Sequence, residues 1–174
     1  MPKALLSIDG KSALSLIIEN LRACNLHSTV VVVSRGILEK ARCFEKNAKI
    51  AVNPYPERGM LSSVKIGIST SPEMDGYLIM PVDHPYVKPE TYAQLIAQFR
   101  KKSDAVIKPV FNSISGHPII IPKGIFKKIP DGDVPGGLNA IIKSSDAEII
   151  EIPVDDNGIL RNINYPQDMH KNEK

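Results

Sequence analysis

The chain has 174 residues, 43% of them hydrophobic, which is enough to bury one substantial core and predicts a single domain. Its net charge is +3, acids and bases are interspersed, and the one basic cluster, at 100–102, closes an expected helix, so nothing indicates nucleic-acid binding. With two distant cysteines and no apolar run near the roughly 20 residues that cross a bilayer, the sequence excludes a disulfide framework and a membrane span, and predicts a cytoplasmic protein.

Two hydrophobic periodicities alternate along the first two thirds of the chain, one typical of amphipathic helices and one of buried strands. In chain order we expect a helix over 14–21 capped by Ser12, a strand over 29–33, a short helix over 37–44, a strand over 49–52, a helix over 61–68, a strand over 77–80, a helix over 89–99 and a strand over 105–110. Nearly continuous apolar strands between such helices predict an α/β fold with a doubly wound, mostly parallel sheet.

The last third of the sequence changes character. A polar turn at 112–115 joins the strand before it to an apolar run at 118–121, which predicts a small antiparallel excursion from the main sheet. Further elements are expected as a short helix near Ile125, a helix over 138–142 and a strand over 148–154. Asp156, Asn157 and Gly158 then predict a hairpin-type turn into 159–161.

One carboxylate ends the strand in GYLIMPVDHPYVKPE, residues 76–90. The apolar run leads directly to Asp83, followed by His84 and Pro85. In an α/β protein the carboxyl ends of the strands form the edge where ligands bind, so Asp83 is placed to hold a cation against a phosphate. The alternative is that Asp83 only caps a helix or a turn.

Five motifs in one order resemble a known family. They are NPYPERGMLSSVKIGI, GYLIMPVDHPYVKPETYAQLI, SGHPIIIP, IPDGDVPGG and NINYPQDM. Their order and spacing are similar to the MobA/MocA-like nucleotidyltransferases, especially the molybdenum-cofactor cytidylyltransferase branch. The resemblance implies a Rossmann-like fold and transfer of a nucleoside monophosphate to a phosphate-bearing acceptor such as molybdopterin, with release of pyrophosphate. It favours CTP over GTP as the nucleotide substrate. A homodimer is left open.

The resemblance also exposes a gap at the N-terminus. Family members open with a strand and a glycine-rich phosphate loop, roughly LAAGxSxRMGxPK, whereas MPKALLSIDGKSALS matches only the end of that pattern. We therefore expect residues 1–174 to be one nucleotidyltransferase-like domain, truncated at its N-terminus by a misplaced start or a shortened reading frame. Because the first strand of such a sheet is central, two inward strands should lack a partner.

The resemblance assigns Mg²⁺ as the cofactor and gives two residues to the metal. Asp83 would be a ligand, and Asn164 stands where most of the cytidylyltransferase branch has an acid, so its carbonyl could ligate without adding charge. Lys3 matches the lysine that follows the phosphate loop and would contact the triphosphate, with Asp83 as the other catalytic residue. The alternatives are a surface lysine at a frayed terminus and a turn asparagine.

The nucleotide would lie beside the loop and helix of the first motif. Gly59 would let the backbone approach the base, and Ser62 and Ser63 would offer hydroxyl or N–H groups. Asn53 would orient the loop or contact the base. Helix capping by the serines and turn formation by Asn53 are the alternatives.

Two further motifs are expected on the acceptor side. Gly116, His117 and Pro118 resemble the GHP motif of the cytidylyltransferase branch, in which His117 could donate to the acceptor phosphate or be an ordinary strand residue. Gly132 and Asp133 match the GD turn of the family or form a plain surface turn.

Other functions remain open beside the transferase. A non-catalytic nucleotide-binding domain would fit the missing phosphate loop and the asparagines at 162 and 164. A sugar-phosphate nucleotidylyltransferase would use the same architecture, and a reductase is a narrower third option. Magnesium-dependent binding of CTP with pyrophosphate release would distinguish the transferase from the binding domain.

Overall fold

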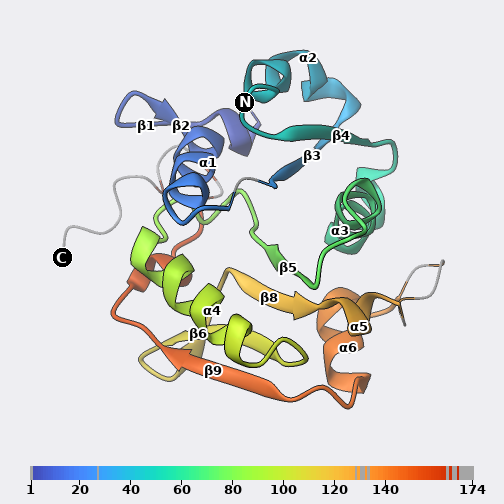
Figure 1. Ribbon diagram of the computed structural model, residues 1–174. Coiled ribbons are helices and arrows are strands. Elements are labelled where there is room, and N and C mark those ends of the chain that lie inside the picture. Colours follow the sequence, from blue (N-terminus) through green and yellow to red (C-terminus); the bar gives the residue numbers. More distant parts are fainter. Residues whose placement is uncertain are drawn as a thin grey trace.

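The computed structural model describes residues 2–26, 28–127, 129, 132, 134–163, 165 and 168, with helices on both faces of the strands (Figure 1). The strands are β1 (Ser7–Ile8), β2 (Lys11–Ser12), β3 (Val30–Ser34), β4 (Lys49–Asn53), β5 (Gly76–Ile79), β6 (Val106–Phe111), β7 (Ile114–Ser115), β8 (Ile119–Pro122) and β9 (Ile149–Pro153). The α-helices are α1 (Ala13–Ala23), α2 (Leu38–Ala41), α3 (Met60–Thr70), α4 (Pro89–Lys101), α5 (Lys123–Phe126) and α6 (Gly137–Ser144). The 3-10 helices are η1 (Lys3–Leu5), η2 (Arg35–Ile37), η3 (Arg42–Phe44), η4 (Pro56–Arg58) and η5 (Asn157–Ile159).

The first long helix begins where its cap predicts. The Ser12 hydroxyl accepts a hydrogen bond from the backbone N–H of Ser15 at 3.1 Å, which satisfies one of the amides that have no partner in the first turn. Ile17 and Leu21, on the apolar face of α1, are buried against α4 residues and Val87. The predicted positions of the other main helices and strands are confirmed as well.

The main sheet has five strands in the order β5-β8-β6-β7, with β9 beside β6. The β6–β9 pair is parallel, whereas β8 and β7 pair with β6 in antiparallel fashion. This arrangement confirms the α/β class and the antiparallel excursion, although the five-stranded sheet is more mixed than expected. Alternate side chains of β6 serve two cores: Val106 packs with α3, α5 and α6, and Ile107 packs with α4.

The two strands nearest the centre each have one partner. β3 pairs in parallel with β4, from Val30 opposite Lys49 to Ser34 opposite Asn53, and β5 pairs with β8. Among the described strands β3 and β5 do not pair with each other, although each packs against a core cluster to which α1 contributes: Val31 against the cluster with Leu14 and Ile18, and Leu78 against the cluster with Ile17. Figure 1 shows the β3–β4 pair as a unit separate from the larger sheet. Two inward strands without a partner were expected; β3 and β5 each have one partner and lack a second among the described strands, and the truncation itself stays a prediction.

The predicted hairpin at 156–161 is wrong. Asp156 caps the 3-10 helix η5, and its carboxylate accepts from the Gly158 N–H at 2.9 Å. The residues after Gly158 find no strand partner among the described elements, because the neighbouring edge of β9 pairs with β6. Among the residues that the structure describes, no helix has the length and apolar character needed to cross a membrane.

Candidate active site

The strand directions bring two predicted segments to one edge of the sheet. β5 and β6 run the same way, because each is antiparallel to β8. Their carboxyl ends therefore lie at the edge where β8 begins. The loop after β5 carries Asp83 to this edge, and His117 and Pro118 directly precede β8. This edge is where α/β proteins bind ligands.

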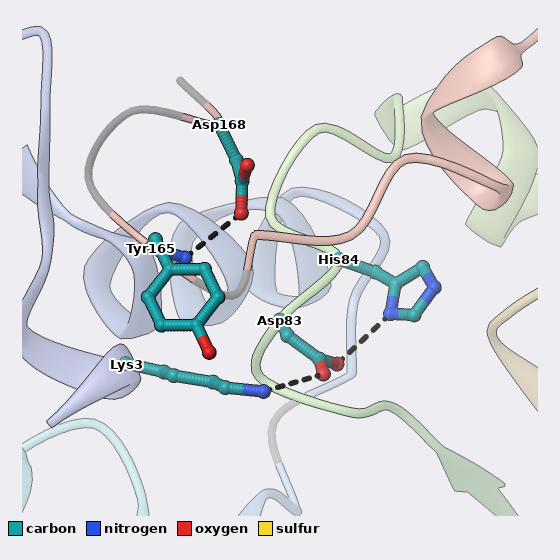
Figure 2. A network of polar contacts seen from close by, with 5 residues as sticks. All are labelled: Lys3, Asp83, His84, Tyr165 and Asp168. Carbon is teal, nitrogen blue, oxygen red and sulfur yellow. Dashed lines mark hydrogen bonds and ion pairs between the residues drawn. The ribbon is translucent and has the colours of Figure 1, made fainter.

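Asp83 lies between a histidine and a lysine. Its Oδ1 is 3.0 Å from Nδ1 of His84 and its Oδ2 is 3.4 Å from Nζ of Lys3, and Figure 2 shows the two partners approaching the carboxylate from opposite sides. The hydrogen bond with His84 lowers the pKa of Asp83 below its ordinary value, burial opposes this shift, and the charges of His84 and Lys3 support it. Asp83 is therefore a carboxylate at neutral pH, as a ligand of a hard cation must be.

The lysine of this cluster comes from an anchored segment. Lys3 starts η1, and its neighbours Ala4 and Leu6 are buried. The Leu6 carbonyl accepts from the Ala13 N–H at 2.9 Å, which ties the segment to α1. The Lys3 side chain remains 42% exposed, so its amine has room to move from Asp83 to a bound phosphate.

His117 faces His84 across the site. The two ring centroids are 5.1 Å apart in an edge-to-face arrangement. Nδ1 of His117 is buried without a hydrogen-bond partner in the described structure, which leaves a donor or acceptor available for a ligand. Burial lowers the pKa of His117, and the charges of His84 and Lys108 lower it further against the raising effect of Asp83. At neutral pH the His117 ring is therefore uncharged.

Sequence reasoning missed Lys108 and undervalued His84. Lys108 lies two residues beyond Val106 on the same face of β6, where its charge acts on His117. A charged residue inside an apolar strand was the available signal. The sequence showed His84 only as the residue that follows Asp83; its side chain is 12% exposed and contacts Asp83.

The first motif forms a tightly bonded loop at the start of α3. Asn53 is 1% exposed; its Oδ1 accepts from the Tyr55 N–H at 2.9 Å, and its Nδ2 donates to the hydroxyls of Ser62 at 2.8 Å and Ser63 at 3.0 Å. Gly59 precedes α3 with a φ of 82°, a conformation that favours glycine. The structure thus brings these four predicted residues together, with Asn53 in the loop-orienting position.

A cavity of about 630 Å³ joins this loop to the acceptor-side turn. Gly59, Ser62 and Lys65 line one side and Gly132 lies on the other. Nζ of Lys65 donates to the Gly132 carbonyl at 2.8 Å across the cavity. Asp83 and His117 do not line this space, so the predicted residues form two groups, one around Asp83 and one around Gly59.

The remaining residues predicted for the acceptor side pack against the chain. A side chain at Gly116 would collide with the carbonyl oxygen of Ile159, so close backbone packing requires this glycine. Pro118 is buried and joined to His117 by a cis peptide bond. The predicted residues Asp133 and Asn164 lie outside the described residues.

The described side chains fit a Mg²⁺ site in which the protein supplies few of the ligands. Within the described ranges no group of three or more His, Cys, Asp or Glu side chains converges on a point. An ionised carboxylate such as Asp83 fits a Mg²⁺ ion that takes most of its ligands from phosphates and water. Figure 2 also shows Tyr165 and Asp168 on the Lys3 side of this cluster, where the Tyr165 N–H donates to Oδ2 of Asp168 at 2.8 Å.

The candidate site combines one carboxylate, two imidazoles and two amines at the ligand-binding edge of an α/β sheet: Asp83, His84, His117, Lys3 and Lys108. Such a set fits a phosphorylated ligand that binds together with a cation. A family model described as the MobA-like NTP transferase domain matches residues 1–149, so the chain belongs to this family. A protein named probable molybdenum cofactor guanylyltransferase, from Bacillus cereus, is 33% identical over 112 residues. That match covers 64% of this chain and 54% of the relative, so the chain spans about half the length of the curated relatives it matches.

Solved structures support the same fold. Rv0371c from Mycobacterium tuberculosis has a TM-score of 0.80 at 17% identity, covering 97% of this chain and 86% of that one. A second structure of Rv0371c, in complex with manganese, has a TM-score of 0.73 at 17% identity and covers 88% and 81%. Molybdopterin-guanine dinucleotide biosynthesis protein A from Archaeoglobus fulgidus has a TM-score of 0.68 at 16% identity and covers 97% and 87%. The predicted Rossmann-like nucleotidyltransferase fold is confirmed.

Proposed function

We propose that this protein is a Mg²⁺-dependent nucleotidyltransferase that moves a nucleoside monophosphate from a nucleoside triphosphate to a phosphate-bearing acceptor such as molybdopterin. The observation that carries the proposal is the ionised Asp83 at the carboxyl edge of β5, with Lys3 and His84 on its two oxygens. The family membership and the relative's name support the reaction class.

The reaction needs positioning and charge neutralisation rather than a covalent intermediate. An acceptor phosphate oxygen attacks the α-phosphorus, the bond from that phosphorus to the β-bridging oxygen breaks, and pyrophosphate leaves with the bonding electrons. Asp83 would hold the cation, with Asn164 as a second oxygen ligand, and the bound cation would neutralise phosphate charge. Lys3 would leave Asp83 for a triphosphate oxygen.

The two substrates would bind on different sides of the site. Gly59, Ser62 and Ser63, held by Asn53, would bind the nucleotide. His117 would offer its buried Nδ1 to the acceptor phosphate. Gly116, Pro118, Gly132 and Asp133 complete the acceptor side of the proposal.

The sequence motif and the named relative favour different nucleotide bases. The GHP-type motif resembles the cytidylyltransferase branch and favours CTP, whereas the Bacillus cereus relative is named a guanylyltransferase and favours GTP. We propose CTP, and a competition between equal concentrations of the two triphosphates tests the choice directly. A clear preference for GTP would overturn it.

Pyrophosphate release tests the reaction itself. The protein is mixed with CTP or GTP, Mg²⁺ and molybdopterin, and compared with Asp83→Ala and with Asp104→Asn, which removes a 79% exposed carboxylate elsewhere. We expect turnover in the wild type and Asp104→Asn, and at least a hundredfold loss in Asp83→Ala, because a metal site of this kind contributes several kcal/mol. Undiminished turnover in Asp83→Ala would end the proposal, and triphosphate binding without turnover in the wild type would instead assign a non-catalytic nucleotide-binding domain.

A further inference from the structure

The segment 155–163, which follows β9, holds both loops of the candidate active site. On the Asp83 loop, the N–H of Ile163 donates to the Asp83 carbonyl at 2.7 Å, and the guanidinium of Arg161 lies 3.7 Å above the Tyr86 ring. On the other loop, the N–H of His117 donates to the Ile159 carbonyl at 3.0 Å. One short stretch of chain is therefore bonded to the backbone of Asp83 and to the backbone of His117.

Asp156 anchors this segment from the inside of the protein. It is 2% exposed, and its Oδ2 accepts from the Lys88 N–H at 2.8 Å and from the Thr91 hydroxyl at 2.6 Å. Its Oδ1 accepts from the Gly158 N–H at 2.9 Å. A buried carboxylate that is deprived of such donors is strongly destabilised, so these bonds fix the segment against the start of α4.

The packing around Asp156 leaves little freedom. A side chain at Gly158 would collide with the carbonyl oxygen of Tyr86, and one at Gly116 would collide with that of Ile159. Nζ of Lys88 also donates to the Asp155 carbonyl at 2.9 Å. The segment thus touches the Asp83 loop near both of its ends and the His117 loop at its centre.

We propose that segment 155–163 is a clamp that sets the separation of the Asp83 and His117 loops, and that Asp156 is the positioning residue that holds the clamp in place. Asp156 touches neither of the two side chains and acts through Lys88, Gly158 and the backbone of 159–163. This inference rests on the proposed function for its catalytic consequence only. The clamp itself is a property of the protein without substrates.

The contact between the His84 and His117 rings gives a readout that does not depend on activity. Their ring centroids are 5.1 Å apart, close enough for a nuclear Overhauser effect between ring protons. In Asp156→Asn an amide N–H replaces one acceptor oxygen, so at least one of the three donors loses its partner. We expect this signal to weaken severely in the folded Asp156→Asn protein and partly in Thr91→Val, which removes one donor.

Ile107→Val is the matched control. It trims a fully buried side chain on the α4 face of β6 and so lowers stability through lost packing, but it does not touch the clamp. Its histidine signal should equal that of the wild type. If Asp156→Asn does not fold, Thr91→Val against Ile107→Val carries the same test.

Turnover supplies the second measurement. Because a misplacement of about 1 Å can cost on the order of a hundredfold, kcat in Asp156→Asn should fall at least about tenfold, whereas kcat in Ile107→Val should stay close to that of the wild type. An unchanged histidine signal in both clamp variants would overturn the proposal, and so would an equal loss of kcat in Asp156→Asn and Ile107→Val. If the wild type shows no turnover but Asp156→Asn loses the histidine signal, the proposed function is refuted and the clamp is supported.

Discussion

Nζ of Lys3 lies 3.4 Å from Oδ2 of Asp83, although the two residues are 80 positions apart in the chain. The amine therefore occupies the side of the carboxylate that a cation would use. A bound metal and a bound triphosphate would separate the pair, with the cation on Asp83 and the amine on phosphate. The ion pair holds both groups in place until those ligands arrive.

Replacing Lys3 by Met should weaken triphosphate binding with little effect on stability. A charged hydrogen bond to phosphate contributes about 1.5–3 kcal/mol, which predicts roughly ten- to hundredfold weaker binding by calorimetry. The Lys3–Asp83 pair is partly exposed, with 42% and 23% of the side chains accessible, so the free energy of unfolding should change by less than about 1 kcal/mol. Lys11→Met, which breaks the exposed pair with Glu19, is the control and should bind triphosphate normally. Equal affinity in Lys3→Met and Lys11→Met would contradict the role of Lys3.

The stability of the protein should fall as the pH drops below about 6.5, the ordinary pKa of histidine. Burial lowers the pKa of His117 in the folded protein, so between the folded and unfolded pKa values the unfolded chain binds more protons. The free energy of unfolding therefore rises with pH through this window and levels off above it. Urea titrations from pH 5 to pH 8 should show this slope in the wild type and a flatter curve in His117→Gln. A slope that His117→Gln leaves unchanged would assign the effect to other groups.

Asn53 should contribute more to stability than its small size suggests. Asn53→Ala would leave the Tyr55 N–H without its acceptor and remove the donor that orients Ser62 and Ser63, at a cost of about 1–3 kcal/mol in urea unfolding. Asn47→Ala is the matched control, because its amide bonds to Arg22 at the surface, and it should cost less than about 0.5 kcal/mol. Similar losses in the two variants would show that the Asn53 network adds little.

The spacing of apolar residues predicted most of the helices and strands of this fold. The acid that follows an apolar strand predicted the position of Asp83 at the end of that strand. The failures have local causes. Asp9 and Gly10 form the turn of the β1–β2 hairpin with positive φ, a signal present in the sequence but passed over, whereas the similar Asp-Asn-Gly sequence at 156–158 caps a 3-10 helix. Only the presence or absence of a partner strand distinguishes the two, and that depends on tertiary structure.

The contacts of the candidate active site were predictable as a set of residue types but not as pairs. Asp83 and His84 are sequence neighbours whose side chains meet only because the loop backbone bends them together at 3.0 Å. Lys3 and His117 reach Asp83 and His84 through the topology of the sheet, which residue spacing does not encode. Lys108 stands out as a charge inside an apolar strand, but the side of the sheet on which it lies becomes known only from the packing of Val106 and Ile107.

The separation of β3 from β5 should appear in hydrogen exchange. β6 is bonded on both sides, by β8 and β7 on one edge and β9 on the other, whereas β3 and β5 each have one described partner strand. Amide groups on an edge without a partner are exposed to solvent whenever the covering helix moves, so the amides of 30–34 and 76–79 that do not bond β4 or β8 should exchange faster than those of 106–111. Mass spectrometry of backbone exchange resolves these segments. Protection of all three strands at the level of global unfolding would show that β3 and β5 are held as firmly as the centre of the sheet, and would contradict the split described here.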